Sequence, residues 1–491
     1  MKRFAALASA SVLALAACSD SPTSPTTISP DGLSVSAAKS SSRVAEVTVA
    51  NDAGPGSFRE AISAAIGNPD IRTVRLDKKL GVISTSSPLV FTGAQSLTIE
   101  GNGGIVDGSS LGALRNALVI SGGGDLVIND LTVRNAPGVG IAVLIPSDAT
   151  GTVNVTLDEV VARSNGLHGV LINDQTGYLT DPESTSPAGS DASLRVRVNR
   201  TTFEGNGDVL IDQDGFRINE GGLGDLEAQI DRTIVLNNGG DGIELDERGP
   251  GSAIFSLEQS RLVGNGFFSA EDYDDGIDVD EAGPGNIEGR FQQVVVNGNF
   301  EQGVDLNEND AGDLRVVMNQ VEASDNAEEG IEFEEDDDFA GGGDIIALLT
   351  NITTLRNGAN DGDAGLKLRE KGAGNLFARI VNATSSDNLI AGILLREDAA
   401  GNLEGTLVNA EANGNADDGI RFDENGAGNL EARIQRASAS NNADAGVAAE
   451  QQVAAGSTDT GSLRIQGLKA TGNGGDSVEA DAGVVVDQKG N

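Results

Sequence analysis

The sequence predicts an all-β chain that coils into a solenoid of short stacked turns. A segment of the form Gly-apolar-x-apolar-x-acidic recurs from Gly242 to Gly446 at spacings of 34, 27, 27, 35, 27, 27 and 27 residues. A turn of about 27 residues is therefore the unit of the fold. The chain has 66 Gly but only 3% aromatic residues, which favours a narrow column of small side chains over one large core.

Residues 1–17 have the pattern of a lipoprotein signal peptide. Lys2 and Arg3 precede an apolar run, Phe4 to Leu15, that is too short to span a bilayer permanently. The run ends in Leu-Ala-Ala-Cys18, similar to the lipobox of bacterial lipoproteins, and Cys18 is the only cysteine. We therefore expect an exported protein lipidated at Cys18 and anchored in the bacterial envelope, in the outer membrane on its periplasmic or surface face.

Residues 18–43 are rich in Ser, Thr and Pro, and we expect them to form a disordered tether. Residues 44–491 are then expected to be a single solenoid domain. At its start, Ser57 to Ala65 is predicted to be an amphipathic helix that caps the first turn, with Ser57 as N-cap and Glu60 three residues later.

The charge and the cysteine count exclude several classes of protein. The chain carries 75 Asp and Glu against 33 Lys and Arg, a formal net charge of −42. Without a cluster of Lys and Arg, so acidic a chain is not expected to bind nucleic acid. A single cysteine excludes a disulfide framework and a Cys-rich zinc site.

One copy of the repeat illustrates the predicted turn. Residues 419–424 and 430–434 alternate apolar and polar residues as strands do, and 425–429 between them has the composition of a tight turn. A third short segment, 437–440, leads to the next copy. Three short strands in parallel register with the neighbouring turns would bury a thin aliphatic column.

Two polar columns accompany the repeat. An Asn lies four residues before the repeat Gly in the copies without insertion, and these residues include Asn238, Asn299, Asn326, Asn388, Asn415 and Asn442. A Glu lies five residues after it and shares the parity of the inward apolar positions: Glu220, Glu247, Glu281, Glu308, Glu335, Glu370, Glu397 and Glu424. We expect each Glu to accept hydrogen bonds from the backbone N–H groups of its Gly-rich turn, with shared protons or bound cations as alternatives.

The period and the stacked Asn resemble a right-handed parallel β-helix of the pectin lyase-like superfamily. The segment Asn-Asp-Ala-Gly-Pro-Gly-Ser-Phe-Arg-Glu-Ala-Ile at 51–62 is similar to the opening segment of bacterial surface β-helix proteins. The resemblance implies this fold for the chain from about Val44 onward, with the Asn side chains forming a hydrogen-bonded ladder. The superfamily includes pectate lyases, which bind Ca²⁺ through carboxylates beside Arg and Lys on one outer sheet. The resemblance therefore also permits an enzyme of this kind.

The second and fourth positions after the Gly are expected to face outward, and four consecutive turns are acidic there. These candidate calcium ligands are Glu244, Asp246, Asp278, Asp280, Asp305, Glu332 and Glu334, and nearby loops add Asp272, Asp274, Asp275, Glu328, Glu329 and Asp336 to Asp338. Carboxylate oxygens at this density suit Ca²⁺. The alternative is a solvated acidic face that keeps the protein soluble.

Signs of catalysis are few. In a lyase the base would be Lys or Arg, and Lys367, Arg369 and Arg396, just beyond the acidic turns, are the nearest candidates. The only histidine, His168, directly precedes the repeat Gly169, which indicates a turn residue. A catalytic centre is also expected to break the repeat at one turn, and the repeat is regular.

Three functions follow from these observations. The leading expectation is a non-catalytic envelope protein that displays loops, such as 178–189 and 267–275, for adhesion or carbohydrate binding. The second is a calcium-dependent, pectate-lyase-like polysaccharide lyase or another carbohydrate-active enzyme. The third is a structural component of the envelope.

Overall fold

The computed structural model describes residues 43–179, 186–270, 273–336, 342–360, 362, 364–452 and 459–490. The predicted signal peptide, the lipidation site Cys18 and nearly all of the predicted tether lie outside these residues. Residues 42–491 form one compact unit. No helix in the described part of the chain is long and apolar enough to cross a membrane.

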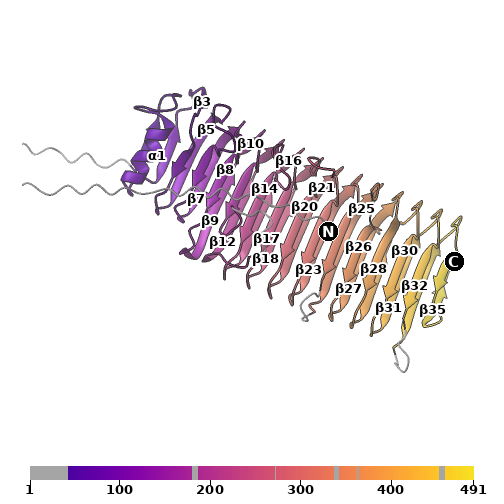
Figure 1. Cartoon of the computed structure of the whole chain (residues 1–491). Coiled ribbons are helices and arrows are strands. Elements are labelled where there is room, and N and C mark those ends of the chain that lie inside the picture. Colours follow the sequence, from indigo (N-terminus) through magenta and orange to yellow (C-terminus); the bar gives the residue numbers. More distant parts are fainter. Residues whose placement is uncertain are drawn as a thin grey trace, which may run out of the picture. The chain divides into compact units, whose positions relative to one another are not determined.

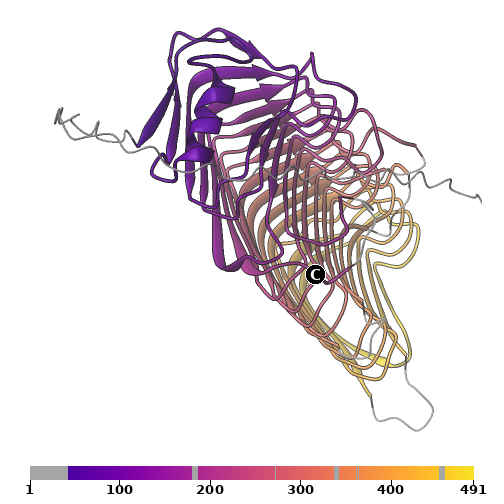
Figure 2. The same ribbon diagram turned by 60° about the vertical axis from the view of Figure 1, so that its left-hand side comes forward.

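The unit is a parallel β-solenoid of about 14 turns, each about 29 residues long on average. The turns follow one another from the N-terminal to the C-terminal end of the stack (Figure 1) and enclose a common axis (Figure 2). The predicted fold class, an all-β right-handed parallel β-helix with a short N-terminal helix, is confirmed. Within the described residues the strands form two parallel sheets, sheet A with 21 strands and sheet B with 14.

Sheet A forms two faces of each turn. Its strands are β1 (Val44–Val47), β2 (Thr73–Leu76), β3 (Val82–Ser84), β5 (Leu97–Asp107), β7 (Leu126–Arg134), β9 (Thr150–Asp158), β10 (Val161–Arg163), β12 (Asp191–Asn199), β13 (Thr202–Glu204), β15 (Leu226–Asp231), β16 (Ile234–Leu236), β18 (Ala253–Glu258), β19 (Arg261–Val263), β21 (Ile287–Asn297), β23 (Leu314–Ser324), β25 (Ile345–Leu355), β27 (Leu376–Ser386), β29 (Leu403–Val408), β31 (Leu430–Ser438), β33 (Gly461–Lys469) and β35 (Val484–Lys489). In the long strands β21, β23, β25 and β27 a residue with positive φ makes the corner between the two faces: Gln293, Gln320, Asn351 and Asn382.

Sheet B forms the third face and carries the repeat segment. Its strands are β4 (Leu89–Phe91), β6 (Leu118–Ile120), β8 (Ile141–Leu144), β11 (Val170–Asn173), β14 (Phe216–Glu220), β17 (Ile243–Glu247), β20 (Ile277–Glu281), β22 (Val304–Glu308), β24 (Ile331–Glu335), β26 (Ala364–Glu370), β28 (Ala391–Glu397), β30 (Ile420–Glu424), β32 (Val447–Gln451) and β34 (Val478–Ala480). Parallel in-register pairing stacks each position of the repeat on the same position of the next turn, as in Asp278↔Asp305↔Glu332.

Helix α1 (Phe58–Gly67) packs against β1, β2 and β4 at the first turns (Figures 1 and 2). The Ser57 hydroxyl accepts a hydrogen bond from the Glu60 N–H at 3.2 Å, as expected of an N-cap. Phe58 and Ile62 are buried beneath it. One continuous apolar core then runs from Val47 to Val484, and fully buried Phe rings such as Phe291, Phe333 and Phe422 widen the aliphatic column at intervals.

The Asn column forms a continuous ladder at the corner before sheet B. From Asn165 to Asn442 each side-chain N–H group donates to the side-chain oxygen of the next member, at 2.9 to 3.2 Å. The members are Asn165, Asn206, Asn238, Asn265, Asn299, Asn326, Asn357, Asn388, Asn415 and Asn442. The ladder explains the repeat Gly: a Cβ on Gly303 would lie 2.6 Å from Nδ2 of Asn326.

Candidate cation-binding site

The structure stacks all seven predicted calcium ligands on the outer face of sheet B, and we call this surface the acidic strip. The second position after the Gly gives one column, Glu244↔Asp278↔Asp305↔Glu332↔Lys367, and the fourth gives another, Asp246↔Asp280↔Asn307↔Glu334↔Arg369. The strip thus runs across strands β17, β20, β22 and β24. A cationic side chain follows it in both columns.

The acidic strip is partly buried. Glu244 is 6% exposed, Asp246 1% and Glu332 4%. The turns between sheets A and B supply further carboxylates directly before the repeat Gly, namely Asp214, Asp241 and Asp275, which are themselves buried. The other four members of the strip, Asp278, Asp280, Asp305 and Glu334, are half-buried, so part of the strip remains open to solvent.

Two arginines neutralise the N-terminal end of the strip. Arg217 on β14 is 3% exposed and forms ion pairs with Asp212 at 2.9 Å, with Asp246 at 2.6 Å and with Glu244. Arg248 bridges Asp246 and Asp280 at 2.7 and 2.9 Å. Burial lowers the pKa of Arg217, but the surrounding carboxylates, led by Glu244, outweigh this effect and raise it. Both guanidinium groups therefore stay charged.

His168 lies beside this cluster as part of a buried hydrogen-bonded group. Its Nδ1 accepts a bond from the Asp214 N–H at 2.9 Å, so in the neutral ring Nε2 carries the proton and donates to the Tyr178 hydroxyl at 2.9 Å. The guanidinium of Arg217 lies 4.8 Å from the centre of the Tyr178 ring. His168 and Tyr178 are 2% and 3% exposed, so the pair fastens a loop onto the turns and is closed to solvent.

Cations also neutralise the C-terminal end of the strip. Lys367 pairs with Glu332, with Glu334 at 3.0 Å and with Glu329 at 3.7 Å, and Lys371 pairs with Glu334. Burial lowers the pKa of Lys367, but the charges of Glu332 and Glu329 outweigh burial and raise it. Lys367 therefore holds its proton firmly, which is unfavourable for a general base.

The other two lyase-base candidates are also in ion pairs. Arg369 lies 2.6 Å from Asp398, and Arg396 lies 3.0 Å from Asp423. The structure therefore brings all three candidates to the strip's C-terminal border, each bound to carboxylates of the protein itself.

Between the two ends lie four carboxylates without a cation, Asp241, Asp275, Asp278 and Asp305, which we call the central carboxylates. No Lys, Arg or His in the described ranges forms an ion pair with any of them. One oxygen of Asp278 and one of Asp305 are buried without any hydrogen-bond partner there. Asp275, Asp278 and Asp305 each offer an oxygen within 4.8 Å of the others.

The pKa values of the central carboxylates reflect this crowding. Burial, reinforced by Asp280, Asp241 and Asp305, raises the pKa of Asp278 well above its usual range. Burial likewise raises the pKa of Asp305 to about 7, although a hydrogen bond from Asn307 opposes the shift. Ionising these carboxyl groups together is therefore unfavourable without a cation to compensate them.

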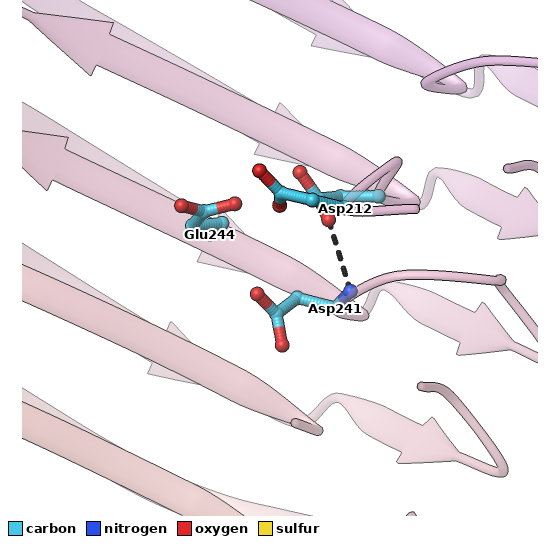
Figure 3. A group of neighbouring side chains, drawn as sticks. Asp212, Asp241 and Glu244 are labelled. Carbon is cyan, nitrogen blue, oxygen red and sulfur yellow. Dashed lines mark hydrogen bonds between the residues drawn. The ribbon is translucent and has the colours of Figure 1, made fainter. Parts of the chain in front are cut away.

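A second group of acidic side chains lies one turn earlier and already forms ion pairs with an arginine. Asp212, Asp214, Asp241 and Glu244 offer oxygens within 4.8 Å of one another (Figure 3). The Asp241 N–H donates to Asp214 at 2.9 Å. Arg217 contacts three of the four carboxylates, so this group is less suited to a metal ion than the central carboxylates.

Exposed apolar side chains border the strip on loops that lead into β14, β20 and β22, and we call them the apolar ridge. Its exposed members are Val209, Leu210, Ile211, Phe267 and Phe300, and the half-buried Tyr273 lies beside Phe300. Phe267 and Phe300 are 40% and 38% exposed, and their ring centres lie 6.3 Å apart. The predicted display loops 178–189 and 267–275 fall only in part within the described residues, which omit Asp272, Asp337 and Asp338.

The sequence interpretation missed Asp214 and Asp241 as members of the site. Their signal is an acidic residue directly before the repeat Gly, which recurs as Asp275, Glu329 and Asp418. Because the turns stack, this residue contacts the next turn. The Asp275 carboxylate accepts a hydrogen bond from the Gln302 N–H of that turn at 2.6 Å, and this bond holds the carboxylate beside the strip.

Comparisons with known proteins find similarity in structure only. No family model matches the sequence, and no curated protein matches it. Pectate lyase Pel9A aligns with a TM-score of 0.38 and 14% identity over 70% of this chain and 79% of that protein. The A-module of the mannuronan C-5 epimerase AlgE6 of Azotobacter vinelandii gives 0.38 and 14% over 90% and 97%.

The catalytic domain of a GH87 alpha-1,3-glucanase gives a TM-score of 0.36 and 11% identity over 90% of this chain and 68% of that protein. Likenesses at this level carry no conclusion about activity. The chain's own strand order and register establish that it is a parallel β-helix, the fold that its resemblance to the pectin lyase-like superfamily predicted.

Proposed function

We propose that this protein is a non-catalytic carbohydrate-binding protein of the bacterial envelope whose binding face is the acidic strip loaded with calcium. The observation that carries the proposal is the set of four central carboxylates, of which Asp241 and Asp275 are buried and Asp278 and Asp305 are half-buried, with no ion pair to a cation among the described residues. A buried carboxylate needs a counter-charge, and hard oxygen ligands at this density favour Ca²⁺ over softer metals.

The central carboxylates fit calcium chemically. Asp275, Asp278 and Asp305 supply six carboxylate oxygens in total, and Ca²⁺ takes six to eight oxygen ligands at about 2.4 Å. The unpartnered oxygens of Asp278 and Asp305 gain a partner when an ion binds. Arg248 and Lys367 flank the group without forming an ion pair with it, so neither of them competes for this place.

The apolar ridge supports carbohydrate as the ligand of the loaded strip. Aromatic rings offer large rigid faces, and the C–H faces of sugar rings pack well on such surfaces. Without bound cations the strip repels acidic sugars, whereas bound Ca²⁺ lets it attract uronate-rich chains. The proposal therefore requires that binding to anionic polysaccharide depends on calcium.

Binding of a glycan array and of uronate polysaccharides, with Ca²⁺ or with a chelator, tests the function. We expect binding in calcium that is lost on chelation and weakened about tenfold in the double variant Phe267→Ala, Phe300→Ala. Leu223→Ala removes a still more exposed apolar side chain off the ridge and serves as control. Absence of binding to any glycan in either condition would reject the carbohydrate ligand and favour a structural component.

The same incubations distinguish binding from catalysis. The ion pairs of Lys367, Arg369 and Arg396 favour binding without turnover. Sustained release of unsaturated sugars that stops in Arg396→Ala would replace the proposal with a polysaccharide lyase.

The envelope location rests on the sequence of residues 1–18. We propose that Cys18 carries the lipid and that the protein fractionates with the outer membrane. Cys18→Ser should release the protein from membranes and abolish incorporation of a labelled fatty acid. A Cys18→Ser protein that still fractionates with membranes would contradict the anchor.

A further inference from the structure

A second column of carboxylates lies inside the solenoid, and we call Glu220, Glu247, Glu281, Glu308, Glu335, Glu370, Glu397 and Glu424 the inner Glu column. All eight side chains are 0% exposed. In-register pairing stacks Glu370 on Glu397 and Glu397 on Glu424, and Gln451 takes the same position in the following turn. The last three glutamates lie beyond the acidic strip, and the inference concerns them.

One oxygen of each of these carboxyl groups is bound by its own turn. Oε1 of Glu370 accepts the N–H groups of Gly372 and Gly374 at 2.8 and 3.2 Å. Oε1 of Glu397 accepts the Ala399 N–H at 2.9 Å, and Oε1 of Glu424 accepts the Gly426 N–H at 3.3 Å. This half of the arrangement is the one expected from the sequence.

The other oxygen has no such partner. Oε2 of Glu370, Glu397 and Glu424 is buried, and no N–H or O–H group in the described part of the chain donates to it. The carboxyl group of the adjacent turn lies within hydrogen-bonding reach, Glu397 next to Glu370 and Glu424 next to Glu397. Two carboxyl groups can form that bond only if one of them carries a proton.

The neighbouring charges increase the need for a proton. Glu335 faces Glu370 from the preceding turn, and Asp459 acts on Glu424 from the far end. The cationic and acidic residues adjacent in sequence belong to ion pairs on the outer face: Arg369 with Asp398, Lys371 with Glu334 and Asp336, and Arg396 with Asp423. Glu335 and Asp459, which act on the column from its two ends, are both acidic.

A metal ion suits the column poorly. Each gap between turns offers the free oxygens of two carboxyl groups, far fewer than the six to eight that Ca²⁺ takes. A proton needs one oxygen on each side, which is what two stacked carboxyl groups provide. We propose that Glu370, Glu397 and Glu424 bind protons at neutral pH and share them in carboxyl–carboxylate hydrogen bonds between turns.

The titration of these groups supports the geometry. Burial and the adjacent carboxyl group of Glu424 raise the pKa of Glu397 to about 8, and burial raises that of Glu370 to about 7. In the unfolded chain both groups lose their protons near the ordinary value of about 4.3. The folded state therefore holds extra protons between these values, and the stability they contribute is lost as the pH rises through about 7 to 8.

Difference infrared spectroscopy at pH 7 on the whole protein tests the proposal directly. We expect a carbonyl band of a buried protonated carboxyl group that weakens in Glu397→Gln and persists in Glu404→Gln, an exposed control on sheet A. Gln451 shows that the column accepts an amide at this position, so Glu397→Gln is expected to fold. An identical band in wild type and Glu397→Gln would overturn the proposal.

Urea unfolding between pH 6 and pH 9, in a chelator, gives a second readout. The unfolding equilibrium constant of the wild type should rise with pH. If Glu397→Gln removes one bound proton from the folded state, the constant of the variant should rise about tenfold less per pH unit. Equal pH dependence in wild type and Glu397→Gln would contradict shared protons. Stabilisation by added K⁺ or Ca²⁺ that disappears in Glu397→Gln would identify a cation column instead.

Discussion

Two columns of carboxylates lie on opposite faces of the same strands, and the protein neutralises them differently. Asp280 points to the outer face of β20 and Glu281, the next residue, points to the core. The outer strip is compensated by Arg217, Arg248, Lys367 and Lys371 at its two ends and leaves four carboxylates between them. The inner column is compensated turn by turn by backbone N–H groups.

The difference follows from the geometry of a repeat. An inward position meets the same small space and the same Gly-rich turn in every copy, so one local solution serves all of them. An outward position meets loops whose length changes from turn to turn, so its charges are compensated by particular side chains. An outward carboxylate can therefore have a cationic partner at one turn and none at the next. Among the described residues, the central carboxylates have no such partner.

Removing the buried cation of the outer strip should have the largest effect. Arg217→Met leaves Glu244 without its guanidinium partner in a closed site, which is expected to cost about 3–5 kcal/mol of unfolding free energy at pH 7. Urea denaturation measures the loss. Arg290→Met breaks an exposed pair with Glu258 and should cost less than about 1 kcal/mol; equal losses would contradict the account of the strip's end.

Removing one inner glutamate should cost somewhat less. Glu308→Ala leaves the N–H groups of Asp310 and Gly312 without their acceptor and opens a cavity, at about 2–4 kcal/mol. Thermal unfolding measures the loss, and Glu308→Gln, which keeps an acceptor oxygen, should retain most of the stability. An unchanged melting temperature in Glu308→Ala would show that the turns do not depend on the column.

The neutral Asn ladder offers a comparison without charge. Asn388→Ala deprives the buried Asn415 of a donor at 3.1 Å and should cost about 1–3 kcal/mol. Asn429→Ala, in an exposed Asn stack at the turn before β31, should change stability by less than about 0.5 kcal/mol. If the two variants unfold at the same urea concentration, burial does not determine how much these ladders contribute to the free energy of unfolding.

The smallest effect is expected at the central carboxylates in the absence of divalent ions. Asp305→Asn removes a carboxylate that forms no ion pair with a cation in the described ranges, so it should raise the unfolding free energy by about 1 kcal/mol in a chelator. Urea denaturation in EDTA checks the sign. Destabilisation there would mean that this charge is already compensated in the folded chain.

The sequence was sufficient for the parts that repeat. The period, the strand alternation, the Asn column and the inward parity of Glu308 follow from spacing, because stacked turns give equal positions equal surroundings. The ion pairs of Glu244, Asp246 and Glu332 were not predictable, since they depend on which cationic side chains lie beside the strip in the folded chain. Arg217 went unnoticed because it lies in a weak copy of the repeat, and its four carboxylate partners come from two turns.

The central claim is that the central carboxylates bind calcium, and isothermal titration of the whole protein with CaCl₂ tests it most directly. We predict saturable binding in the wild type that is lost in the double variant Asp278→Asn, Asp305→Asn and retained in Asp444→Asn, which alters an acidic group away from the strip. The absence of binding heat and of any thermal shift at millimolar Ca²⁺, or binding that survives in the double variant, would contradict the claim.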